Sequence, residues 1–240
     1  MSSLTVLITG ATSGIGLSLV EQYLSRGDKV IACGRSKEKM LQIDSRGAQS
    51  CLFDITDELC VEHAAKDIES VDILILNAGD CSYIDDPIHF DGHVFSKIIA
   101  TNLTALGTLL AHFLPKVNKG GQVVFVSSSA TILPFPRSEA YGASKAGVDY
   151  LANSLRLDLI EHNIDVTLVH PGFVKTPLTD KNTFAMPFMI SSSEAADRMV
   201  TGIEKRQEYL HFPKRLTLLL KLFSLLPTAL WAKIIRKTIE

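Results

Sequence analysis

The chain has few cysteines and no export signal. Its four cysteines, Cys33, Cys51, Cys60 and Cys81, include no Cys-x-x-Cys pair. The N-terminus has no basic stretch followed by an apolar segment of the kind that directs export. These two absences favour a reducing cytoplasm.

The chain also has no excess of positive charge. Lysines and arginines number 24, against 26 aspartates and glutamates, so the formal net charge is −2 at pH 7. Domains that bind nucleic acid usually present a strongly basic face. We therefore predict no nucleic-acid partner.

Two further missing patterns exclude other chemistry. The run Ser127-Ser128-Ser129 could suggest a serine hydrolase, but the chain contains no Gly-x-Ser-x-Gly elbow, which disfavours hydrolysis. His89 and His93 stand four residues apart, a spacing that can hold a metal, although a solvated loop or helix start explains it more simply. We predict no metal site.

Apolar runs alternate along the chain with longer amphipathic stretches. Runs such as Val123–Val126 do not alternate apolar with polar residues, which is typical of strands covered on both faces. We therefore predict an α/β fold with one doubly wound parallel sheet, helices on both faces and ligands at the carboxyl ends of the strands. No repeat or linker divides the chain, so residues 1–240 are expected to form one domain. The predicted strands are Leu4–Thr9, Lys29–Cys33, Ala48–Phe53, Asp72–Leu76, Gln122–Val126, Asp165–Val169 and Tyr209–Phe212.

Two groups of residues suggest a reaction. Gly10, Gly14 and Gly16 follow the first predicted strand, where missing side chains let the backbone and a helix N-terminus approach a pyrophosphate. Tyr141 and Lys145 share one face of a helix, so the ammonium can lower the cost of ionising the phenol. Tyr141 is therefore a candidate proton donor and acceptor.

The motifs occur in an order that closely resembles the short-chain dehydrogenase/reductase family, from Thr5 to about Phe212. They are Thr9-Gly10-x-x-x-Gly14-Ile15-Gly16, Asn77-Ala78-Gly79, Asn102, Ser128, Tyr141-x-x-x-Lys145 and Pro171-Gly172. The glycine spacing differs from the Gly-x-Gly-x-x-Gly of other Rossmann-type proteins, which favours this family. Leu76 and Thr131 depart from its usual Asn and Gly. The resemblance implies a Rossmann-type, NAD(P)-dependent oxidoreductase that forms a homodimer or homotetramer.

The resemblance also implies roles for the catalytic residues. Tyr141 delivers or removes the proton, and Lys145 lowers the pKa of Tyr141 and holds the nicotinamide ribose. Ser128 positions the substrate oxygen, and Asn102 supports a water chain to Lys145. The implied cofactor-binding residues are Gly10, Thr12, Ser13, Gly14, Ile15, Gly16, Arg35, Asp54, Ile55, Asn77, Ala78, Gly79, Tyr141, Lys145, Pro171, Gly172 and Thr176.

Arg35 decides the predicted cofactor. An NAD-preferring enzyme would need an acidic residue at the end of the second strand, where this chain has Gly34 followed by Arg35. A guanidinium offers a fork of donors to the 2′-phosphate of NADP(H). We therefore predict NADP(H), with NAD(H) as the alternative and a solvent-facing strand cap as the other explanation of Arg35.

The segment from residue 213 to residue 240 is apolar with basic flanks and is expected to be helical. Lys221 and Pro227 interrupt it, so a membrane-spanning helix is not predicted. It can cover the substrate pocket, pack on its own domain or a sister subunit, or make peripheral contact with a membrane. We expect packing on protein and keep membrane contact as the alternative.

The leading hypothesis is an NADP(H)-dependent oxidoreductase that interconverts a carbonyl and an alcohol of apolar character. The rival is a dinucleotide-binding sensor or scaffold without turnover. The presence of Ser128, Tyr141 and Lys145 argues against the rival. Substrate identity depends on Lys175–Ser193, a predicted loop whose shape the sequence does not define.

Overall fold

A seven-stranded sheet in the order β3-β2-β1-β4-β5-β6-β9 forms the centre of the computed structural model, which describes residues 3–239. Its strands are β1 (Thr5–Thr9), β2 (Lys29–Gly34), β3 (Gln49–Leu52), β4 (Val71–Leu76), β5 (Val117–Val126), β6 (Asp165–Pro171) and β9 (Tyr209–Phe212). Each neighbouring pair is parallel. The chain starts in the middle and winds outward both ways, which confirms the predicted doubly wound fold.

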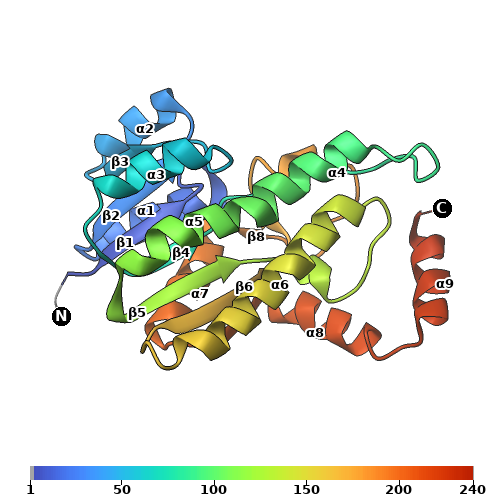
Figure 1. The fold of residues 1–240 in the computed structure, drawn as a ribbon. Coiled ribbons are helices and arrows are strands. Elements are labelled where there is room, and N and C mark those ends of the chain that lie inside the picture. Colours follow the sequence, from blue (N-terminus) through green and yellow to red (C-terminus); the bar gives the residue numbers. More distant parts are fainter. Residues whose placement is uncertain (1–2, 240) are drawn as a thin grey trace.

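Helices cover both faces of the sheet (Figure 1). One face packs against α1 (Gly14–Ser25), α2 (Lys37–Asp44) and α7 (Ser192–Glu204). The other packs against α3 (Glu58–Lys66), α5 (Ala105–Phe113) and α6 (Glu139–Leu159). Successive strand residues point to opposite faces, so Leu7 and Ile8 are both fully buried but belong to different cores. This explains why the central strands are continuously apolar.

A long helical stretch runs from α4 (Gly92–Ile99) through a π-helical segment (Ala100–Thr104) into α5. By length and hydropathy alone Gly92–Lys116 could cross a membrane. Leu109 and Phe113 in this stretch are fully buried in the core between α5 and the sheet. The π segment contains Asn102, and such local irregularities are frequent at functional sites.

Two regions contain structure beyond the predicted strands. The expected loop over Lys175–Ser193 includes a small parallel sheet of β7 (Val174–Lys175) and β8 (Ile190–Ser191) and a short 3₁₀ helix, Thr179–Lys181. The C-terminal extension forms two helices, α8 (Lys214–Phe223) and α9 (Thr228–Ile239). Figure 1 shows them in red, with α9 turned away from the sheet. Glu240 lies outside the described residues.

Candidate active site

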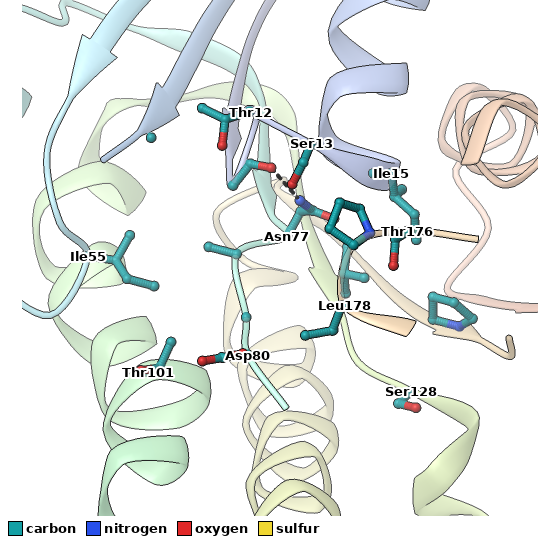
Figure 2. A pocket seen from close by; sticks show the side chains of 18 of the residues that line it. Thr12, Ser13, Ile15, Ile55, Asn77, Asp80, Thr101, Ser128, Thr176 and Leu178 are labelled. Carbon is teal, nitrogen blue, oxygen red and sulfur yellow. Dashed lines mark hydrogen bonds between the residues drawn. The ribbon is translucent and has the colours of Figure 1, made fainter. Parts of the chain in front are cut away.

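A cavity of about 350 Å³ opens at the carboxyl ends of the strands, where the sequence predicted a ligand. Figure 2 shows side chains from several separate segments pointing into it. The predicted residues that line it are Gly10, Thr12, Ser13, Gly14, Ile15, Arg35, Asp54, Ile55, Asn77, Ala78, Gly79, Ser128, Tyr141, Lys145, Pro171, Gly172 and Thr176. Of the predicted site residues, Gly16 and Asn102 do not line it.

The glycine turn after β1 is shaped to receive a phosphate group. Gly10 and Gly14 have φ angles of 66° and 54°, which side-chain-bearing residues rarely adopt. A Cβ at Gly14 would also lie 2.8 Å from Cγ2 of Thr176. Gly16 serves packing instead, because a Cβ there would lie 2.2 Å from the carbonyl oxygen of Gly10. The bare backbone and the N-terminus of α1 thus fit a dinucleotide pyrophosphate.

Thr9 connects this turn to the segment after β4, a function that the sequence analysis did not predict. Its Oγ1 accepts hydrogen bonds from the backbone N–H groups of Asn77, at 3.0 Å, and Ala78, at 3.1 Å. In return, Nδ2 of Asn77 donates to the Thr9 carbonyl oxygen at 3.0 Å. Thr9 directly precedes Gly10, so its place in the glycine motif was the sequence feature that could have predicted this function.

Arg35 lines the cavity just after β2 and is mostly exposed, with Nη1 3.6 Å from Oδ2 of Asp54. The backbone N–H of Thr56 donates a hydrogen bond to Oδ1 of Asp54. This hydrogen bond is the main cause of the lowered pKa of the Asp54 carboxyl group. A Cβ at Gly34 would lie 2.6 Å from Cγ2 of Thr12. The position where an NAD enzyme carries an acid therefore has no room for one unless Thr12 moves.

Tyr141, Lys145 and Ser128 come together in the wall of the same cavity. Nζ of Lys145 lies 5.9 Å from the centre of the Tyr141 ring and donates a hydrogen bond to the Val126 carbonyl oxygen at 2.8 Å. Lys145 is buried, and this desolvation lowers its pKa to about 8, although the charge of Asp149 acts in the opposite direction.

The expected lowering of the Tyr141 pKa by Lys145 is not present in this structure. Burial raises the pKa of Tyr141 to about 12, and a hydrogen bond with the Ser128 side chain offsets only part of this. Loss of water from around the phenolate disfavours the charged form and is the largest cause of the raised pKa. Tyr141 is thus held in its protonated form, the state a proton donor requires.

Asn102 lies behind the cavity and connects two of its walls. Its Nδ2 donates to the Asp80 carbonyl oxygen at 2.8 Å and to Oγ of Ser144 at 2.9 Å. Its Oδ1 accepts from the Asp80 backbone N–H at 2.8 Å. Asn102 therefore connects the loop after β4 to α6 by hydrogen bonds, and its partner on α6, Ser144, lies three residues after Tyr141. The predicted water chain through Asn102 stays a prediction.

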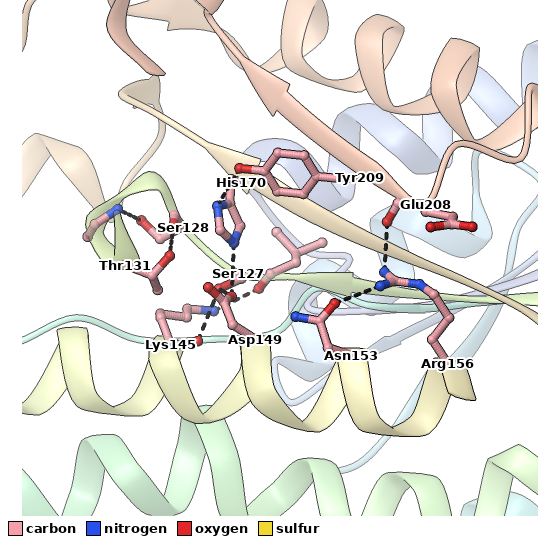
Figure 3. Close-up of polar contacts among 12 residues, drawn as sticks. Ser127, Ser128, Thr131, Lys145, Asp149, Asn153, Arg156, His170, Glu208 and Tyr209 are labelled. Atoms are coloured by element: carbon pink, nitrogen blue, oxygen red, sulfur yellow. Dashed lines mark hydrogen bonds and ion pairs between the residues drawn. The ribbon is translucent and has the colours of Figure 1, made fainter. Parts of the chain in front are cut away.

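A second polar network that the sequence did not reveal lies behind Lys145 (Figure 3). Oδ1 of Asp149 accepts from Oγ of Ser127, at 2.5 Å, and lies 2.9 Å from Nε2 of His170. Nδ1 of His170 lies 3.0 Å from the Tyr209 hydroxyl. Ser127 and His170 directly precede Ser128 and Pro171, so this network joins α6 to the two strand ends that line the cavity. Its signal was faint, namely an Asp four residues after Lys145 and a His before Pro171-Gly172.

The C-terminal helices form an apolar wall beside the active site. Leu216 and Trp231 pack with Leu133 in a core cluster, with Phe135 and Phe173 around them. Nε1 of Trp231 donates to the Pro134 carbonyl oxygen at 2.8 Å. Since the segment over 132–135 follows Ser128 closely, the extension packs on the protein's own domain next to the substrate side.

No group of three or more metal-ligating side chains is present within residues 3–239. His89 and His93 lie in a loop and at the start of α4, and both are exposed. Nδ1 of His89 lies 2.6 Å from a carboxylate oxygen of Asp86. Both histidines therefore have the solvated surroundings that the sequence suggested.

The fold and cavity define a dinucleotide-binding oxidoreductase of the Rossmann type, and comparisons with known proteins identify its family. Residues 4–187 match the family model described as short chain dehydrogenase. The chain therefore belongs to the short-chain dehydrogenase/reductase family and is an NAD(P)-dependent enzyme of that family.

Several relatives cover most of the chain. It is 32% identical over 242 residues to an uncharacterized oxidoreductase of Myxococcus xanthus, with 96% of each chain covered. It is 31% identical to a fatty acyl-CoA reductase of Acinetobacter baylyi, over 88% of this chain and 74% of that one. A short chain dehydrogenase of Burkholderia cenocepacia solved with NADP is 25% identical, with 98% of both chains covered and a TM-score of 0.86.

Proposed function

We propose that this protein is an NADP(H)-dependent oxidoreductase that interconverts an apolar carbonyl compound and its alcohol, with Tyr141 as the proton donor and acceptor. The observation that carries the proposal is the meeting of Ser128, Tyr141 and Lys145 in the same cavity as the glycine turn. One cavity would then hold both the phosphates of the cofactor and the reacting groups.

The chain's own residues orient the reactants and move the proton. The bound nicotinamide would donate or accept the hydride. Ser128 and Tyr141 would hold the substrate oxygen, and the raised pKa of Tyr141 keeps a proton ready for it. Charged Lys145 would stabilise the phenolate left after transfer and hold the nicotinamide ribose. Pro171, Gly172 and Thr176 would hold the nicotinamide ring.

Support for NADP(H) comes from Arg35 and from solved relatives. Arg35 is mostly exposed and lines the cavity, where its guanidinium would bind the 2′-phosphate of NADP(H). A short-chain dehydrogenase of Sphingobium yanoikuyae, 28% identical with a TM-score of 0.78 over 90% of this chain and 92% of that one, was solved with NADPH.

Support for an apolar substrate comes from the wall beside Ser128. Leu133, Phe135, Phe173, Leu216 and Trp231 lie on this side of the site. The similarity to a fatty acyl-CoA reductase is in keeping with a substrate that carries a hydrocarbon chain.

The test is NADPH oxidation by the purified protein with a panel of aldehydes, ketones and quinones of increasing chain length. We expect turnover that improves with chain length and is much slower with NADH. Binding of NADPH without turnover of any substrate class would support the rival sensor or scaffold. A preference for short polar substrates would contradict the apolar pocket.

A further inference from the structure

The helix α8 is apolar on two opposite sides. Its inner side packs Leu216 and Leu220 into the cluster beside the active site. On its outer side Leu218 and Leu222 follow helical spacing and are 56% and 61% exposed, and Leu225, in the turn just after the helix, is 80% exposed. A helix at a protein–water boundary normally turns a polar side outward, so exposed leucines on the outer side of α8 point to a contact with another apolar surface.

Basic residues are concentrated in this segment, although Nζ of Lys214 lies at His211 and Nζ of Lys221 lies over the Tyr209 ring, both on β9. Lys214 and Arg215 begin α8, Lys221 lies within it, and Lys233 is exposed on α9. No aspartate or glutamate occurs between residues 214 and 239. Residues 214–240 hold six basic residues and one acid, a net charge of +5, which leaves −7 on the rest of a chain whose total is −2. Positive charge is thus concentrated in the C-terminal segment, while the rest of the chain is net negative.

We propose that the outer side of α8, formed by Arg215, Leu218, Leu219 and Leu222, together with Leu225 just after the helix, docks on the surface of an anionic phospholipid bilayer. Such a surface offers hydrocarbon to the leucines and negative headgroups to the basic residues. Arg215 can extend its guanidinium toward the headgroups while its methylene stem stays among the leucines.

A second copy of this chain fits the surface less well. A symmetric dimer places the same patch of both copies face to face, which would bring Arg215 and its basic neighbours against their own duplicates. The resulting repulsion is absent when the partner is an anionic lipid. The expectation that this segment only packs on protein therefore holds for its inner side and is revised for its outer side.

Docking would bring the substrate side of the enzyme close to lipid. Leu216, on the inner side of α8, packs so near Gly172 that a Cβ there would lie 2.7 Å from Cδ2 of Leu216. Phe173 and Leu133 join the same cluster. An apolar substrate dissolved in the bilayer would then enter the site near Ser128. This consequence rests on the proposed function, but the docking of α8 on lipid does not.

The experiment is sedimentation of the full-length protein with vesicles of phosphatidylglycerol and, separately, of phosphatidylcholine. We expect the wild type to sediment with phosphatidylglycerol, to be released by high salt, and to stay largely soluble with phosphatidylcholine. The double variant Leu218→Ser/Leu222→Ser should bind about tenfold or more weakly, because two large apolar side chains are lost from the contact.

A matched control uses exposed leucines elsewhere. Leu41 on α2 and Leu59 on α3 are 62% and 65% exposed, so Leu41→Ser/Leu59→Ser makes the same chemical change away from α8. It should sediment like the wild type. NADPH binding by each variant reports whether the fold is intact. Vesicle binding needs no turnover, so its outcome is independent of the activity test of the proposed function.

Hydrogen exchange of the wild type gives a second readout that needs no variant. Phosphatidylglycerol vesicles should slow amide exchange over α8 and leave α3 unchanged. Absence of both sedimentation and protection would overturn the proposal. So would a concentration-dependent dimer that the α8 double variant abolishes while vesicles have no effect, since a second copy would then cover this surface.

Discussion

Arg35 is the residue on which the cofactor preference depends. Arg35→Ala should weaken NADPH binding by about one to two decades, the effect of losing one charge-assisted contact worth about 1.5–3 kcal/mol. NADH affinity should hardly change, because NADH has no 2′-phosphate. Fluorescence titration with both cofactors measures the two dissociation constants.

Arg46→Ala provides a control for this measurement, since Arg46 is also a surface arginine paired with a carboxylate, that of Glu21. It should leave both affinities unchanged. An equal loss for both cofactors in Arg35→Ala would assign Arg35 a structural role. A wild-type preference for NADH would overturn the NADP(H) assignment.

Lys145 should make carbonyl reduction sensitive to pH. Its pKa is lowered to about 8, so it is charged below that pH and neutral above it. Because reduction needs the charged form beside Tyr141, kcat/KM should fall as pH rises through about 8. The negative charge of Asp149 raises the pKa of Lys145, so Asp149→Asn should move this fall to lower pH.

The variant Asp158→Asn is the control for the pH measurement, because Asp158 is exposed on the same helix. Asp158→Asn should leave the pH at which kcat/KM falls unchanged. An asparagine at residue 149 can still accept hydrogen bonds from Ser127, so the fold should survive. A profile that does not move in Asp149→Asn would contradict the electrostatic link between Asp149 and Lys145.

At the level of elements, the start of α8 is connected to β9 through His211. Its Nε2 lies 3.0 Å from Nζ of Lys214, and its Nδ1 lies 2.7 Å from Oγ1 of Thr217. An ammonium can only donate, so Nε2 accepts and Nδ1 donates to Thr217. This arrangement needs the neutral imidazole.

Acid should therefore loosen α8. Burial, aided by Lys214, Lys221 and His170, lowers the pKa of His211 from 6.5 to about 4. Between pH 6.5 and 4, His211 is protonated in the unfolded chain but not in the folded protein. Protonation therefore favours unfolding, and the stability that neutral His211 contributes above pH 6.5 is lost as pH falls toward 4. Hydrogen exchange should show α8 opening across this range in the wild type.

His211→Gln should remove that pH dependence, because glutamine does not titrate. His162→Gln, at an exposed loop histidine, should retain it. Protection of α8 that is constant from pH 6.5 to 4 in the wild type would show that His211 does not control this helix.

The elements that sequence could predict are those with strong local patterns. All seven strands of the main sheet were predicted, because continuous apolar runs such as β4 mark strands buried on both faces. The two-residue strands β7 and β8 are too short to leave a pattern. The contacts of Asp149 with His170 and of Arg35 with Asp54 join distant segments, so residue spacing does not predict these pairings.

At the scale of the whole molecule, we expect self-association through α6. Tyr150 and Leu157 on this helix, and Ile160 at its end, are 80%, 70% and 68% exposed and lie on one side of it. Burying this apolar stripe against a second copy would form the homodimer or homotetramer that the family resemblance implies. Light scattering should give two or four times the chain mass of 26.3 kDa.

The variant Tyr150→Asp/Leu157→Asp should shift this equilibrium toward the monomer, because it places charges within the proposed contact. Leu41→Asp/Leu59→Asp, on α2 and α3, is the control and should leave the assembly intact. A wild-type protein that remains monomeric at every concentration would refute this expectation.

The most direct test of the central claim compares Tyr141→Phe with the wild type, because this change removes only the hydroxyl that would move the proton. NADPH affinity and the rate of NADPH oxidation should be measured on the same preparations. We predict nearly unchanged NADPH affinity and a loss of turnover of about 10²-fold or more, the usual contribution of a general acid. Turnover within a few-fold of the wild type would contradict the role assigned to Tyr141.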